Sequence, residues 1–413
     1  MREDNGRALI ESESPARSAR FETGKVATVA AGHAVHDTFT AFLPPLLPVF
    51  IEKFGLSITG AGFLTVFLQV PSLVQPAIGR LADRFNLRPL VLWAPALAAV
   101  FMSLLGVAPG YAWIALLLTL AGLNSAGLHA VAPIMAGNVS GSRLGRGMSF
   151  WMVGGELGRT LGPIIVVSVV APLSLKGMLW LMPAGLAVSL LLNVQLRQVP
   201  YHARAAASST PWRTALRGMG PVFIPLTLFI ALRAFLQSAA ITYLPTYLTG
   251  RGESLWFAGA ALTILQGAGV AGALVSGSLS DRIGRKAILI SCVLCAPLFT
   301  WLFLTSGGWI QAVMTALLGF FVISPTPVVM ALVQESFPEN RAFANGVYMG
   351  LSFVIRSTVV VLVGIMGDRL GLHTTFLISA GLMLLALPAA LRLPGRLSSS
   401  SRMIPRNGPA GRP

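Results

Sequence analysis

Long apolar runs alternate with short polar breaks along almost the whole chain. Each run holds roughly the 20 residues that a helix needs to cross a bilayer, and the breaks contain charged residues, glycine or proline. The pattern predicts twelve spans in two sets of six: 26–51, 59–80, 89–108, 111–137, 148–172 and 177–196, then 220–248, 255–279, 287–306, 309–335, 343–366 and 373–391. The sequence therefore predicts an all-α membrane protein with 12 transmembrane helices.

Polar segments flank and divide the two sets of spans. The predicted parts are an N-terminal tail (1–25), a six-helix half (26–196), an interdomain loop (197–219), a second six-helix half (220–391) and a C-terminal tail (392–413). The N-terminal tail mixes arginine with acidic residues and lacks an apolar core, so it does not resemble a cleaved signal peptide. The Ser, Pro, Gly and Arg composition of the C-terminal tail predicts disorder.

Composition excludes a soluble globule, because 54% of the residues are hydrophobic, 11% are charged and the mean hydropathy is +0.75, whereas soluble domains carry about 25% charge. The net charge of +16 comes from 30 lysine and arginine residues, most of which fall in the tails and the loops on one side. Four fall on the other side, Lys53, Lys176, Arg251 and Arg369. By the positive-inside rule both termini are cytoplasmic, and the charge marks topology and not nucleic-acid binding.

A short motif occurs once in each half. Gly79, Asp83 and Arg84 recur as Gly277, Asp281 and Arg282, displaced by 198 residues. The repeat indicates two pseudo-symmetric halves that arose by duplication. An aspartate beside arginines in a tight loop can cap a helix and form ion pairs that hold one conformation. The alternative is that these residues only supply the positive charge of a cytoplasmic loop.

These features resemble the major facilitator superfamily from about residue 26 to residue 391. The loop motif of that family stands complete from Gly277 to Lys286, with Arg285 in its expected place, and is degraded in the first copy. Within the superfamily the chain resembles the fosmidomycin-resistance branch of drug exporters. The segments that carry this second resemblance are Gly32-His33, His36-Asp37 with Pro44, Gln75-Pro76 with Gly79, Gly127-Leu128-His129, Gly154-Gly155-Glu156-Leu157-Gly158 and Gly162-Pro163. The chain departs from that branch at Ala130, where proline is common, and at Glu156, where asparagine is common.

The resemblance implies a secondary transporter, not an enzyme, that exports a drug or metabolite by alternating access. The chain lacks a phosphate-binding Gly-x-x-x-x-Gly-Lys-[Ser/Thr] motif, so the energy must come from an ion gradient or from the substrate's own gradient. A proton gradient is the expected source, and no cofactor is expected. Arginine outnumbers lysine, which suggests a bacterial inner membrane. Expected partners are a small substrate, protons and lipid, with a monomer as the working unit. The alternatives are a proton symporter that imports a metabolite, an intramembrane enzyme that uses His33, His36 and Asp37, and a channel.

Ionisable residues inside a bilayer are costly and are functional candidates by default. His33, His36 and Asp37 have i, i+3, i+4 spacing and share one helix face. Because burial favours the neutral form of a carboxylate, Asp37 is the predicted proton-coupling acid, with both histidines as relays or substrate contacts. The alternative is a structural hydrogen-bonded cluster. A metal site normally needs a third or fourth ligand beyond such a group. Cys292 and Cys295 are best interpreted as ordinary helix residues, so no metal site is expected.

In the fifth span Gly154, Gly158 and Gly162 form a stripe that allows another helix to approach closely. Glu156 and Arg159 point away from that stripe and can face a central cavity. If they stay paired, they position the helix. If transport separates them, Glu156 becomes a second proton-coupling acid, and the sequence leaves both readings open.

The remaining candidates are substrate contacts. Arg233 and Gln237 share a face of the seventh span, and Arg356 lies in the eleventh at nearly the position equivalent to Arg159. Gln69 and His129 complete the set with Arg159, although a lone histidine is more often a packing residue. Two deep acids against three arginines leave a positive cavity, which favours an anionic or zwitterionic substrate such as a phosphonate or a carboxylate. The alternative for each arginine is a fixed ion pair.

Overall fold

The computed structural model describes residues 21–82, 84–197, 219–337 and 341–394. Within these residues every regular element is a helix. The predicted tails and interdomain loop lie mostly outside the described residues, as does Asp83 of the first loop motif. The all-α prediction is confirmed for the described part of the chain.

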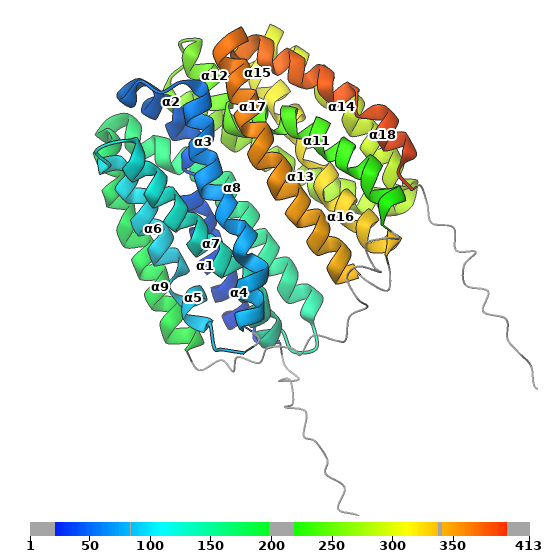
Figure 1. Cartoon of the computed structure of the whole chain (residues 1–413). Coiled ribbons are helices and arrows are strands. Elements are labelled where there is room, and N and C mark those ends of the chain that lie inside the picture. Colours follow the sequence, from blue (N-terminus) through cyan, green and yellow to red (C-terminus); the bar gives the residue numbers. More distant parts are fainter. Residues whose placement is uncertain (1–20, 83, 198–218, 338–340, 395–413) are drawn as a thin grey trace, which may run out of the picture.

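The first bundle contains the helices drawn in blue, cyan and green in Figure 1. It consists of α1 (Thr23–Thr40), α2 (Leu43–Phe54), α3 (Ile58–Gln69), η1 (Val70–Val74), α4 (Gln75–Ala82), α5 (Arg88–Leu92), α6 (Ala94–Leu104), η2 (Leu105–Val107), α7 (Tyr111–Val139), α8 (Leu144–Leu173), η3 (Leu175–Leu181) and α9 (Met182–Leu196). Proline marks several of the breaks, as at the start of α2 and in η1, because it cannot donate the hydrogen bond that a continuing helix requires.

The second bundle is drawn from green to red in Figure 1. It consists of α11 (Gly220–Thr242), α12 (Leu244–Gly250), α13 (Leu255–Ile283), α14 (Arg285–Thr305), α15 (Gly308–Ile323), α16 (Pro325–Ser336), α17 (Arg341–Leu384) and α18 (Leu387–Arg392). One buried apolar cluster fills most of this bundle, and it includes Phe229, Tyr243, Phe303 and Phe376. Two separate clusters fill the first bundle.

Ten helical segments among the described residues are long and apolar enough to cross a membrane. The difference from the predicted twelve has two sources. The predicted span 89–108 is broken into short helices, and its apolar part Ala94–Val107 falls below that length. The predicted spans 343–366 and 373–391 lie in one long helical stretch, Ala344–Arg392, in which Gly371 has a positive φ of 76° and interrupts the helical geometry.

Helices α1 and α8 approach each other closely along the predicted glycine stripe. A methyl group added at Gly154 would lie 2.3 Å from the carbonyl oxygen of Ala30. At Gly158 it would lie 2.2 Å from the carbonyl oxygen of Ala34, and at Gly162 it would meet Thr38 in the same way. The absence of side chains at these three positions of α8 therefore lets the two backbones touch and fixes the register between the helices.

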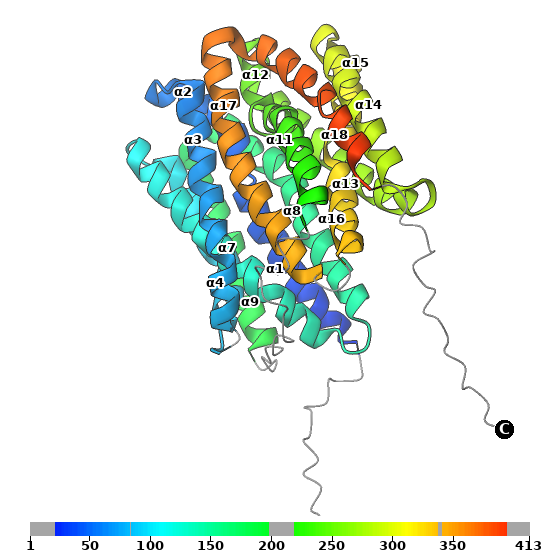
Figure 2. The same cartoon turned by 45° about the vertical axis from the view of Figure 1, so that its right-hand side comes forward.

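The two bundles meet mainly through α3 against α17 and α8 against α13, pairs that lie side by side in Figure 1 and Figure 2. The described hydrogen bonds between the bundles sit away from the end where α1 begins. Asp368 of α17 accepts from the backbone nitrogens of Ile58 and Thr59 at 2.7 and 2.9 Å. In the second half of α8, the backbone nitrogen of Ile164 donates to Thr263 at 3.2 Å. The bundles are thus joined at one end.

Candidate proton and substrate site

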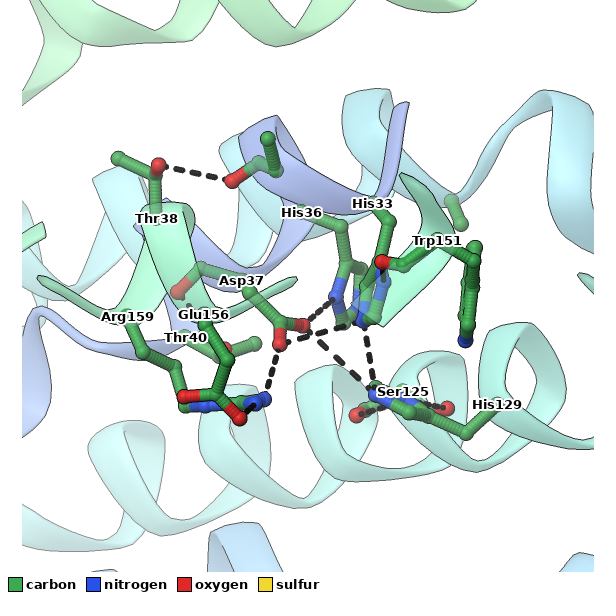
Figure 3. A network of polar contacts seen from close by, with 12 residues as sticks. His33, His36, Asp37, Thr38, Thr40, Ser125, His129, Trp151, Glu156 and Arg159 are labelled. Atoms are coloured by element: carbon green, nitrogen blue, oxygen red, sulfur yellow. Dashed lines mark hydrogen bonds and ion pairs between the residues drawn. The ribbon is translucent and has the colours of Figure 1, made fainter. Parts of the chain in front are cut away.

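Asp37 is the centre of a buried polar network on α1 (Figure 3). Its side chain is 3% exposed, and Arg159 of α8 donates to Oδ2 at 2.5 Å. His36 Nδ1 lies 2.9 Å from Oδ1, His33 Nε2 lies 3.3 Å from Oδ2, and His129 Nε2 of α7 lies 3.8 Å from Oδ1. Three helices therefore direct charged or titratable groups at one carboxylate.

Backbone carbonyls fix the orientation of two of the histidines. His33 Nδ1 lies 2.9 Å from the carbonyl oxygen of Trp151, and His129 Nδ1 lies 2.9 Å from that of Ser125. Because a carbonyl only accepts, both Nδ1 atoms carry the hydrogen. The His33 ring also stacks on Trp151, with ring centroids 3.6 Å apart and planes 14° apart. The remaining nitrogens, His33 Nε2 and His129 Nε2, face each other at 3.2 Å.

Arg159 connects the two acids of the first bundle. One guanidinium nitrogen binds Asp37 and the other binds Glu156, its neighbour one turn earlier. The side chains of Arg159 and Glu156 are 37% and 34% exposed, whereas Asp37 is buried. Of the two interpretations that the sequence left open, the described conformation has Glu156 and Arg159 paired.

Sequence reasoning grouped His33, His36 and Asp37 through their helical spacing, and the structure places them together. It assigned His129 to the substrate, whereas the structure brings that ring into the Asp37 network. Trp151 and Gly155 were missed. A methyl group at Gly155 would lie 2.3 Å from His33 Cε1, so this glycine makes the space that the ring occupies. The adjacent pair Gly154-Gly155 was a usable signal, since only one of the two glycines belongs to the stripe.

His33, Asp37 and His129 offer three ligand atoms that lie within 4.8 Å of one another. That arrangement is small enough for a metal ion. However, the guanidinium of Arg159 already holds the carboxylate at 2.5 Å, and a cation placed there would face that positive charge. We therefore assign hydrogen bonding and not metal binding to these three side chains.

A second polar group lies in the other bundle. Arg233 of α11 is 6% exposed and donates to the carbonyl oxygen of Val322 at 2.7 Å and to Thr326 at 3.0 Å. Its Nε has no hydrogen-bond partner among the described residues, and the same holds for Arg356 Nε of α17. The guanidinium of Arg356 lies 4.9 Å from the ring centroid of Phe353.

Neither Arg233 nor Arg356 forms an ion pair with a described carboxylate, in contrast to Arg159. The two are near enough to interact electrostatically, as are Arg356 and Arg159. Gln69 at the end of α3 has a buried Oε1 without a described partner, and Gln237 is partly buried one turn after Arg233. Arg233 and Arg356 thus contribute positive charge that no described carboxylate pairs with.

The complete loop motif holds elements of the second bundle together. Arg285 forms ion pairs with Asp281 and with Glu335 of α16, each at 2.6 Å. Lys286 donates to the carbonyl oxygen of Leu391 at 2.7 Å. Arg282 is exposed. Of the first copy, Arg84 is also exposed, and a methyl group at Gly79 or Gly277 would meet nothing within 4 Å.

Comparison with known proteins agrees with this architecture. The sequence profile of the Major Facilitator Superfamily matches residues 29–357 and 258–407. The fosmidomycin resistance protein of Escherichia coli (strain K12) is 24% identical over 397 residues, which cover 92% of this chain and 97% of that protein. A probable 4-methylmuconolactone transporter of Cupriavidus pinatubonensis is 28% identical over 345 residues, 79% of each chain.

Among solved structures, a bacterial homologue of the human lysosomal transporter Spinster, in an inward-facing and unoccupied conformation, superposes with a TM-score of 0.72 at 15% identity. The match covers 91% of this chain and 98% of that one. The superposition confirms the predicted fold family at low sequence identity. Together with the profile match over most of its length, it shows that the chain is a membrane transporter, not an enzyme, and belongs to the major facilitator superfamily.

Proposed function

We propose that the protein is a proton-coupled antiporter that exports a small anionic or zwitterionic drug or metabolite across a bacterial inner membrane. The observation that carries this proposal is the pair Arg233 and Arg356, two guanidinium groups inside the second bundle without a described acidic partner. Charges within a bilayer are retained where they have a function. An anionic substrate supplies the compensating charge that the bundle itself lacks.

The charge of the first bundle supports the same substrate class. Asp37 and Glu156 share the single guanidinium of Arg159, which leaves one negative charge for a bound proton to neutralise. With that proton in place the cluster of Asp37, Glu156 and Arg159 is neutral, and the site as a whole carries the two positive charges of Arg233 and Arg356. Arginine holds a phosphonate or a carboxylate through two parallel hydrogen bonds. A fosmidomycin-like phosphonate therefore has both the charge and the shape that the site favours.

Alternating access follows from the way the bundles are joined. The contacts of Asp368 and Thr263 close the end away from the start of α1. With twelve spans, counted by dividing the long stretch at Gly371 and including α5 with α6, both termini are cytoplasmic. The described conformation is then closed on the outer side, and the transport cycle alternates it with a conformation that is closed on the cytoplasmic side.

The second candidate is proton symport that imports a small metabolite. It is kept because the buried proton network fits either direction of transport, and because a probable transporter of a small metabolite, 4-methylmuconolactone, matches 79% of this chain. Both candidates use the same proton network, the same monomeric rocking cycle and no cofactor. They differ only in whether protons and substrate cross in opposite directions or in the same direction, so the sign of substrate-driven proton movement separates them.

The test uses the purified protein in liposomes that contain a pH-sensitive dye, with fosmidomycin added outside. Antiport predicts that inward movement of the drug drives protons out, and symport predicts the opposite sign. Arg356→Gln should raise the half-saturating drug concentration about ten- to one-hundredfold, since a hydrogen bond to a charged group contributes about 1.5–3 kcal/mol. Arg251→Gln, at an exposed arginine outside the site, is the matched control. A half-saturating fosmidomycin concentration that is equal in wild type and Arg356→Gln would overturn the proposed anion site.

A further inference from the structure

We propose that the coupling proton resides between Nε2 of His33 and Nε2 of His129, and that Asp37 stays ionised as its counter-charge. The inference rests on the proposed proton coupling and changes its carrier, since helix spacing alone had pointed to Asp37. The feature that leads to it is the direct approach of two imidazole nitrogens at 3.2 Å from two different helices.

Hydrogen-bond accounting requires a proton at that position. His33 Nδ1 donates to the carbonyl of Trp151, and His129 Nδ1 donates to the carbonyl of Ser125. A neutral imidazole carries one hydrogen, so in neutral rings both Nε2 atoms would present lone pairs to each other. Two buried acceptors at hydrogen-bond distance repel. One shared proton converts that repulsion into an Nε2–H···Nε2 hydrogen bond that the Asp37 carboxylate, 3.3 Å away, stabilises.

The third histidine of the network does not need a proton. His36 Nδ1 donates to Asp37 at 2.9 Å, and His36 Nε2 is buried without a described partner. A second hydrogen on this ring would be a buried donor with nothing to bind, which costs more than an unpaired acceptor on a neutral ring. His36 is therefore neutral, and it fixes the carboxylate without exchanging protons.

The surrounding charges balance with one proton on the histidine pair. The ionisable groups that face the pair come from α1, α7 and α8. The described residues of α6 and α9, which also pack on α1, include none. Of the helices that pack on α7, α4 carries the exposed Arg80 and α5 carries Arg88, which donates to the carbonyl oxygen of Leu196. The groups that face the pair are His36, Asp37, Glu156 and Arg159, with Arg356 of the second bundle beyond Arg159. Two carboxylates and one guanidinium leave a single negative charge. One imidazolium cancels it.

Asp37 is a poor carrier for the same proton. Its Oδ2 lies 2.5 Å from Arg159, and its Oδ1 accepts from His36. A proton on either oxygen would displace a donor that this oxygen already accepts from, and a buried donor left unpaired is costly. The proton is held more favourably one step away, on the histidine that the carboxylate faces.

The two rings also differ in access, which gives the proton a path. The side chain of His33 is 4% exposed and is held by Trp151, whereas that of His129 is 29% exposed. For release, the N–H bond on His33 Nε2 breaks as one forms on His129 Nε2, and water then takes the proton from His129. Both Nδ1–H groups stay on their carbonyls throughout, so neither ring has to flip.

The first test is nitrogen NMR of the full-length protein labelled with ¹⁵N-histidine at neutral pH. We expect one imidazolium among the rings of the network and a scalar coupling between two Nε2 nuclei. His33→Asn and His129→Asn should abolish both signals, because the asparagine amide can replace Nδ1–H but not Nε2. His36→Asn is the matched control and should retain both. Neutral rings without coupling, or zinc bound in equimolar amount by elemental analysis, would overturn the inference.

The second test separates coupling from transport in the same liposomes. His129→Asn should lower fosmidomycin transport driven by a proton gradient at least about tenfold, while gradient-free counterflow of the drug stays near wild type. Equal gradient-driven transport in His129→Asn and wild type would refute the role of the pair. Absence of counterflow in the wild type would refute the proposed transport of this drug instead, and the NMR result would still decide where the proton lies.

Discussion

Asp368 is the residue whose removal should shift the balance between the two open states. It belongs to α17 in the second bundle, yet its carboxylate caps α3 of the first, accepting from the backbone of Ile58 and Thr59 and from the Thr59 hydroxyl. Ser57 caps the same helix from within its own bundle by accepting from the Gly60 nitrogen at 3.0 Å. Two of the free amides of the first turn of α3 are thus satisfied across the bundle interface.

The magnitude follows from these contacts. Replacing a capping side chain by alanine costs about 0.5–2 kcal/mol, and a carboxylate at a helix N-terminus adds about 0.3–1 kcal/mol at exposed positions. Asp368 is exposed, so the total is about 1–2 kcal/mol. This energy is present only when the α3 end is joined to α17. Asp368→Ala should therefore raise the ratio of the state open at that end to the state closed there by about five- to thirtyfold.

The assay is electron–electron distance measurement between spin labels at Lys53, in the last turn of α2, and Glu253, after α12, in a background without Cys292 and Cys295. Both label sites are exposed. Asp368→Ala should increase the population at longer distance, and Asp368→Asn should give a smaller increase, because the amide keeps one acceptor but loses the charge. Arg369→Ala, at the exposed next residue of the same helix, is the control. Identical distance distributions in Asp368→Ala and Arg369→Ala would refute the reasoning.

Three further predictions concern the helices that carry the network. Gly155→Ala should lower the unfolding temperature and the gradient-driven flux together, because its methyl group would lie 2.3 Å from His33 Cε1, and overpacking costs about 1–3 kcal/mol. Gly145→Ala, with nothing within 4 Å, should leave both unchanged. Gly158→Ala should destabilise the protein in a thermal unfolding assay by separating α1 from α8, and stability equal to wild type would contradict that packing. Arg159→Lys should reduce coupled flux with little loss of stability, since one ammonium cannot hold both acids as the fork does; undiminished flux would show that holding both is unnecessary.

Much of the fold could be predicted from the sequence, because length and hydropathy determine whether a helix can cross a bilayer. The sequence was less informative where the number of spanning helices depends on local geometry. The predicted break between spans 343–366 and 373–391 contains Gly371, but the hydropathy pattern does not show that helical structure resumes directly after that residue. It also does not show that the apolar part of the third predicted span is only Ala94–Val107.

In the candidate site, too, the sequence predicts contacts within one helix but not contacts between helices. Helical periodicity groups His33, His36 and Asp37, because residues on one face of one helix are related by spacing alone. The contact of Asp37 with Arg159 spans 122 positions in the chain and that of His33 with His129 spans 96, so both depend on how helices pack. Asp368 was not singled out at all, since an exposed aspartate near a predicted loop has no local signal that reveals a partner 310 positions away.

The glycine stripe between α1 and α8 determines which parts of the network can change during a transport cycle. Because the two backbones touch at Gly154 and Gly158, these helices move as one rigid body, and the side chains on them move together. His33, Asp37 and Arg159 then keep their mutual distances while the pair α1 and α8 tilts. What changes is the access of water to the partly exposed members Arg159 and Glu156. The geometry of the network thus stays constant, while the side of the membrane from which water reaches it alternates.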